Sequence, residues 1–135
     1  MRRTPAALAA AAVAAAASLA AGAPAGAHHA VGAGVDTGQR IVQHMVLTRV
    51  DWINPHAWFH FNVEMPNGSV VYARIEWLSV GGFRQAGYDS SSAFIVGDRF
   101  TVTYNPNRDG SPGGYVVKMV DDDTGRVFEI SRIFS

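Results

Sequence analysis

Two adjacent histidines, His28 and His29, directly follow a segment that resembles an export signal. The segment ends in Ala25-Gly26-Ala27, which has the small-x-small pattern after which signal peptidase cleaves. Cleavage after Ala27 would make His28 the first residue, with a free α-amine and an imidazole on the same residue. Such a pair of nitrogens chelates transition metals, and a square or T-shaped arrangement suits Cu(II). The sequence therefore predicts a terminus that can bind copper.

A different cleavage position leads to the same chemistry. Cleavage after Ala25 would place His28 third, behind Gly26 and Ala27. A histidine in the third position binds Cu(II) through the α-amine, two backbone nitrogens and the imidazole. The predicted metal ligands are His28, His29 and, from the body of the chain, His56, with copper or zinc as the ion. The alternative is that two histidines merely follow a cleavage site in a flexible arm.

The leader itself supports export. Arg2 and Arg3 supply a positive start, and residues 5–23 are almost entirely alanine. A retained transmembrane helix needs about 20 strongly apolar residues, whereas an alanine run is only weakly hydrophobic. We therefore expect residues 1–27 to be a signal peptide, the protein to be periplasmic or secreted, and no membrane span to remain after cleavage.

Length, charge and cysteine content narrow the class of the mature protein. Removing 27 of the 135 residues leaves 108, which is enough for one compact domain. Without Arg2 and Arg3, 9 basic and 11 acidic residues remain, so the net charge is about −2. Nucleic-acid binders usually show a basic surface, and none is expected here. The absence of cysteine excludes disulfides and thiolate metal sites.

Alternating apolar residues predict several short strands and one short helix. Ser79 can cap the helix, expected over Val80–Ala86, and Gly87 can end it. Strands are expected over Ile41–Trp52, Trp58–Met65, Val70–Trp77, Arg99–Tyr104, Tyr115–Val120 and Val127–Ile133. The alternation places these side chains in the core: Val42, Val46, Val50, Phe59, Phe61, Val63, Ile75, Trp77, Phe100, Val102 and Val117.

This order of elements predicts an all-β fold, a small OB-like β-barrel of five to six strands with one short helix. Three strands, a helix and two or three further strands follow each other as in that fold. Closing the sheet also removes exposed strand edges. Residues 28–39 are expected to form a flexible N-terminal arm and residues 40–135 the barrel. A small open β-sandwich would give a similar pattern.

The turn between the first two strands carries a second candidate site. His56 follows the turn signal Asn54-Pro55 and lies between Trp52 and Trp58. At the mouth of a barrel, a histidine there can act as a ligand or a proton donor. Its alternative role is a turn histidine bonded to a backbone carbonyl. Trp52, Asn54, His56 and Trp58 together are a candidate recognition patch.

Two other histidines are expected to lie apart from His56. His60 is on the same strand face, about 13 Å along the backbone at roughly 3.3 Å per residue, so we expect a structural role for it. Hairpin pairing that places Ile53 opposite His56 puts Arg49 near His60. The same pairing puts His44 at the far end of the ladder.

The string Trp52-Ile53-Asn54-Pro55-His56-Ala57-Trp58, with the histidine pair after the signal and Gly97-Asp98 before a strand, resembles one known family. It is an exported bacterial family catalogued as a domain of unknown function, number 6152. The resemblance covers essentially the whole mature chain. It implies a small secreted β-domain and carries no established activity.

These observations favour a non-enzymatic exported binding module for a metal ion or small ligand. A metal-free structural or protein-interaction domain of the cell envelope, with an envelope protein as partner, is the alternative. A small copper-dependent redox enzyme rests only on the terminal histidines. Other chemistry lacks a signature, since no Gly-x-Ser-x-Gly occurs and Asp121–Gly125 lacks the ligand spacing of an EF-hand.

Overall fold

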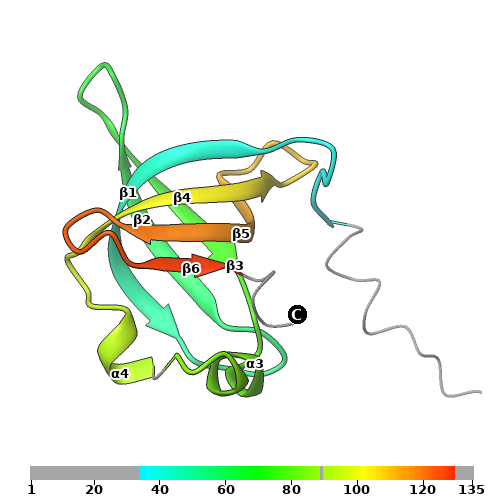
Figure 1. Cartoon of the computed structure of the whole chain (residues 1–135). Helices are drawn as coiled ribbons and strands as arrows, with labels where there is room; N and C mark the ends of the chain where they lie inside the picture. The colour runs from blue at the N-terminus through cyan, green and yellow to red at the C-terminus, as the bar shows by residue number, and fades with distance from the viewer. Residues whose placement is uncertain (1–33, 89, 130–135) are drawn as a thin grey trace, which may run out of the picture. The chain divides into compact units, whose positions relative to one another are not determined.

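The structure, a computed structural model, describes residues 34–88 and 90–129. These residues form six strands and two short helices (Figure 1). In chain order the elements are β1 (Ile41–Asp51), β2 (Trp58–Glu64), β3 (Val70–Glu76), α3 (Val80–Gln85), α4 (Ser90–Ala93), β4 (Arg99–Pro106), β5 (Gly113–Asp121) and β6 (Val127–Glu129). Residues 1–27, the expected signal peptide, and the histidines His28 and His29 lie outside the described residues.

The strands form a closed barrel. They are hydrogen-bonded in the order β3-β2-β1-β4-β5-β6, and β3 also pairs with β5 in parallel. This last pairing closes β1 to β5 into a ring and leaves β6 as an extra strand on β5. With α3 between β3 and β4, the arrangement is that of an OB-type barrel. The expected fold class is confirmed.

The closure of the barrel depends on glycine. Gly113 pairs with Arg74 across the β3–β5 contact. A Cβ atom on Gly113 would lie 2.0 Å from the carbonyl oxygen of Arg74, and its φ of +119° is unfavourable for other residues. The two backbones can therefore approach this closely only without a side chain at position 113.

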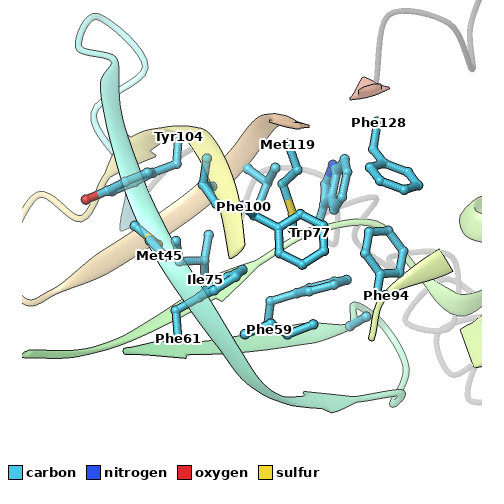
Figure 2. Packing of buried hydrophobic residues seen from close by; sticks show 14 of the residues in the cluster. Met45, Phe59, Phe61, Ile75, Trp77, Phe94, Phe100, Tyr104, Met119 and Phe128 are labelled. Carbon is cyan, nitrogen blue, oxygen red and sulfur yellow. The ribbon is translucent and has the colours of Figure 1, made fainter. Parts of the chain in front are cut away.

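Strict alternation along β2 separates the core from the outer surface of the barrel. Phe59, Phe61 and Val63 are buried inside, while the residues between them face outward. Figure 2 shows Phe59 and Phe61 beside Ile75, Trp77, Phe94 and Phe100 in the core. The predicted core positions Phe59, Phe61, Val63, Ile75, Trp77, Phe100 and Val102 are confirmed.

The prediction for the core face of β1 is wrong over its first half. Met45 and Leu47 are buried, whereas Val42 is 64% exposed and Val46 is only partly buried. A β-bulge between Leu47 and Arg49 adds one residue to the strand. Such a bulge reverses which alternate residues face inward, so Val50 beyond it packs against the core as expected.

A second irregularity explains the error in β5. Thr103 pairs with Lys118, but the next residue, Tyr104, pairs with Val116. Val117 is therefore the extra residue and is only partly buried, whereas Val116 is fully buried. The expected core position moves from residue 117 to residue 116 because of this shift.

The helices close one end of the barrel (Figure 1). The side chain of Ser79 accepts a hydrogen bond from the Gly82 amide at 3.0 Å and caps α3 as predicted. The second short helix, α4, is formed by Ser90–Ala93. Neither described helix has the length and apolar composition needed to cross a membrane.

The described part of the expected N-terminal arm is attached to the barrel. Val35 is buried and bridges to Asn107, and the Asp36 amide donates to the Pro106 carbonyl at 2.8 Å. Arg108 also donates from Nε to the Val35 carbonyl at 2.9 Å. Within the described residues, contacts with the barrel are present from Gly34 onward, before the boundary that the sequence predicts at residue 40.

Candidate functional site

Polar and aromatic side chains gather on the outer surface of β1, β2 and β3. Cross-strand pairing sets Arg49 beside His60 and His60 beside Arg74. The neighbouring row sets Asp51 beside Trp58. Directly opposed residues on one face of a sheet bring their side chains into contact. We call Arg49, Asp51, Trp58, His60, Tyr72 and Arg74 the outer-face cluster.

His60 is the centre of this cluster. It points away from the core, yet its neighbours cover it so that only 3% of it is exposed. Its Nε2 lies 2.8 Å from Asp51 Oδ2, and its Nδ1 is hydrogen-bonded to the Tyr72 hydroxyl. Because a carboxylate only accepts, Nε2 carries the ring proton and Nδ1 accepts from Tyr72. Both ring nitrogens are satisfied, as a buried histidine requires.

Arg49 forms an ion pair with the Asp51 carboxylate. Its Nε lies 3.0 Å from Oδ1 and its Nη2 3.2 Å from Oδ2 of the carboxylate. The same Nη2 is 3.2 Å from His60 Nε2, but two donors cannot bond to each other, so its proton goes to Asp51. The hydrogen bond from His60 and the charge of Arg49 hold the pKa of Asp51 below its usual value.

This lowered pKa predicts a pH-dependent contribution to stability. The lowered folded-state pKa means that ionised Asp51 stabilises the protein above the ordinary value of 3.8, and this contribution is lost as the pH falls. We expect Asp51→Asn to lower the melting temperature clearly at pH 7 and much less at pH 3. Thermal unfolding of both proteins at the two pH values measures the difference. An equal difference at both would contradict the prediction.

Trp58 and Arg74 form the second part of the cluster. The guanidinium carbon of Arg74 lies 3.8 Å from the centre of the Trp58 ring, which is a cation–π contact. Arg74 is exposed, and no carboxylate among the described residues pairs with it. Its guanidinium lies over the ring, while its N–H donors remain available to a ligand.

His56 belongs to a separate histidine–carboxylate pair at the end of β3. Its Nδ1 lies 2.6 Å from Glu76 Oε1, and its ring meets the Tyr115 ring edge-on at 6.4 Å. Burial, and then the negative charge of Glu76, raise the pKa of Tyr115, which stays neutral. Because Glu76 is the cross-strand neighbour of Trp58, this pair borders the outer-face cluster.

The four residues of the candidate recognition patch differ in their surroundings. Trp58 and His56 lie near Glu76, and Asn54 is exposed before a cis peptide bond to Pro55. Trp52, however, packs into the core, with its ring 5.3 Å from Phe83 and 5.9 Å from Phe59. Its indole thus covers the apolar end of the barrel, and a recognition role for the four residues stays a prediction.

The described residues hold no group of three or more histidine, aspartate or glutamate side chains placed to bind a metal ion. His44 lies on β1 opposite Thr101 of β4, and its Nδ1 is 3.0 Å from the threonine hydroxyl. It is therefore apart from His56, as expected. His28 and His29, the other predicted ligands, are outside the described residues.

Sequence reasoning missed most partners in the outer-face cluster. The expected pairing of Arg49 with His60 is confirmed, and it contained a usable signal. Asp51 lies two residues beyond Arg49 and shares its face, so it had to lie near His60 as well. Tyr72 gave no such signal, because its approach depends on the pairing of β2 with β3, which places it opposite Asn62.

The barrel and its outer surface define a small OB-type domain, whose described residues include three histidine–carboxylate pairs, at His44, His56 and His60. The chain belongs to the family of unknown function DUF6152, whose model matches residues 10–116. Comparisons with curated proteins and with solved structures found no match.

Proposed function

We propose that this protein is an exported binding module that holds Cu(II) or Zn(II) with His28, His29 and His56. The leader over residues 1–27 supports export to the periplasm or the medium. The α-amine and ring of His28 supply two nitrogens, and the rings of His29 and His56 supply two more. The amine has a pKa of about 7.7–8.0 in unfolded reference peptides, so a metal can displace its proton near neutrality.

The observation that carries the proposal is the state of the His56 ring. Glu76 accepts the proton of Nδ1, which leaves the lone pair on Nε2. Nε2 has no protein partner among the described residues, and it is not among their buried unpaired atoms, so it reaches solvent. A carboxylate bonded to the far nitrogen is the usual support of a metal-binding histidine, because it fixes the tautomer and the ring orientation.

Copper affinity tests the terminal part of the site. We expect mature protein that begins at His28 to bind Cu(II) at least tenfold more tightly than protein carrying one extra residue ahead of it. The extra residue turns the chelating amine into an amide, which offers no lone pair until it is deprotonated. This loss of affinity should exceed the roughly 10-fold loss that follows removal of a residue that only hydrogen-bonds to a metal ligand. Calorimetric titration of the two proteins measures the ratio.

Two single substitutions test the barrel's share of the site. His56→Ala should weaken copper binding further. The matched control His44→Ala should not, because His44 is exposed and lies where β1 pairs with β4. Mass spectrometry confirms the starting residue of each protein. Equal affinity for the native and extended termini would overturn the metal proposal.

A metal-free interaction domain of the cell envelope is the second candidate. It is favoured by the partly buried Trp58 and the exposed Arg74 on the outer face, since aromatic and arginine side chains are enriched where proteins meet partners. Tyr72, 53% exposed, extends the same surface. Copper titrations that show no binding by the native terminus would leave this candidate as the function.

A further inference from the structure

Tyr72 differs from the other three tyrosines of the chain in its exposure and in its partner. Its side chain is exposed, whereas Tyr104 is buried and Tyr88 and Tyr115 are partly covered. The Tyr104 hydroxyl donates to the amide oxygen of Gln43 at 3.1 Å, an acceptor that does not take up protons near neutral pH. The Tyr72 hydroxyl is bonded to an imidazole nitrogen instead. Tyr72 is thus an accessible phenol beside a base.

The base is itself oriented. Asp51 accepts the Nε2 proton of His60, which turns the lone pair of Nδ1 toward the Tyr72 oxygen. The ionised carboxylate would also stabilise the imidazolium formed when His60 takes up the phenolic proton. A hydroxyl, a base bonded to it and a third group that orients the base are the arrangement that activates nucleophiles.

An arginine lies on the same face of the same strand as Tyr72. Arg74 lies two residues from Tyr72 and faces the same side of β3. Its guanidinium is held over Trp58 and makes no ion pair with any described carboxylate. Charge fixed in this way stabilises the negative oxygen that develops when a nucleophile attacks a carbonyl group.

We infer that Tyr72 is an acyl-acceptor site, which takes an acyl group from an activated ester. The phenolic oxygen forms a bond to the carbonyl carbon as the phenolic proton moves to His60 Nδ1. The bond between that carbon and the alcohol oxygen of the ester then breaks, and the departing oxygen takes the proton from His60. The products are an acyl-tyrosine and the free alcohol, and no oxidant or metal is consumed.

In the test, the mature protein that begins at His28 is treated with p-nitrophenyl acetate. Release of p-nitrophenol gives the rate, and peptide mass spectrometry locates the acetyl group. We expect Tyr72 to be acetylated at least tenfold faster in the native protein than in His60→Gln, because a positioned general base contributes about 10²–10⁴-fold. Asp51→Asn should also slow the reaction, and Tyr72→Phe should remove the label at that position.

Internal controls distinguish activation of Tyr72 by His60 from simple exposure of the Tyr72 side chain. Acetylation of Tyr88 and of Lys118, the one lysine of the chain, should be the same in the native protein and in His60→Gln. Near-ultraviolet circular dichroism checks that each variant is folded. A purely structural role for His60 would change stability while leaving the Tyr72 rate unchanged. Equal Tyr72 rates in the native and folded His60→Gln proteins would overturn the inference.

The pH profile of the native protein gives a second measurement, which needs no variant. The charged and titratable groups around His60 are Asp51, Arg49, Tyr72 and Arg74. With His60 as the base bonded to the phenol, the Tyr72 rate should rise with pH and then level off, because the base and not hydroxide removes the phenolic proton. A rate that keeps rising about tenfold per pH unit through pH 9, as for a free phenol, would contradict the inference.

Discussion

Gly113→Ala should destabilise the protein by more than about 3 kcal/mol, the range of severe backbone and packing defects. The new methyl group would lie 2.0 Å from the Arg74 carbonyl oxygen, so β5 must move away from β3. The parallel β3–β5 contact closes the barrel, and its loss would also displace Arg74 on the outer face. Urea unfolding of the native and variant proteins gives the change in free energy.

Gly110→Ala is the matched control for this prediction. Gly110 lies in the β4–β5 loop, three residues before Gly113, and has a φ of +78°, but a Cβ there would meet no atom within 4 Å. This substitution carries only the conformational cost of a left-handed residue, about 1–2 kcal/mol. If the two alanine variants unfolded at the same urea concentration, the close approach of the backbones would not be what requires glycine at position 113.

Trp52→Ala should cost about 2–3 kcal/mol of stability, somewhat less than the 3–5 kcal/mol typical of a fully buried aromatic residue. The Trp52 ring contacts Phe59, Phe83 and Phe94, which form the apolar end of the core. Its removal leaves a cavity that rigid aromatic neighbours fill poorly. Chemical denaturation measures the loss.

Trp58→Ala provides the comparison, because Trp58 lies on the outer face and is covered mainly by Arg74. We expect a loss of no more than about 1 kcal/mol, the value of an exposed cation–π contact. The two tryptophans, six residues apart in one sequence string, thus separate a core role from a surface role. A greater loss from Trp58→Ala than from Trp52→Ala would show that this assignment is reversed.

The fold could be predicted because its central strands follow simple rules. β2 and β3 alternate without interruption, so Phe59, Phe61 and Ile75 were placed correctly in the core. The order of strands around one capped helix was sufficient to predict the OB-like barrel. The errors occur where a strand contains an extra residue, at the bulges beside Leu47 and at Val117. Alternation cannot reveal a bulge, because the bulge itself changes which residues face inward.

The site was harder to predict than the fold. His56 was identified as a candidate from its turn, but its partner Glu76 is 20 residues away in the sequence. His60 was expected to be structural, and its bonds to Asp51 and Tyr72 became visible only with three strands in register. Trp52 illustrates the opposite problem, since a tryptophan beside a turn suits a recognition patch and a core equally well.

The outer-face cluster also has a consequence for the order of folding. All of its residues lie between Arg49 and Arg74, on three strands that pair with their neighbours in the sequence. The closing contact of the barrel, by contrast, joins Arg74 to Gly113, 39 residues further along. Contacts between distant residues form more slowly because a longer loop must be ordered first. During synthesis and refolding, the hydrogen bonds of His60 should therefore assemble before the barrel closes around its core.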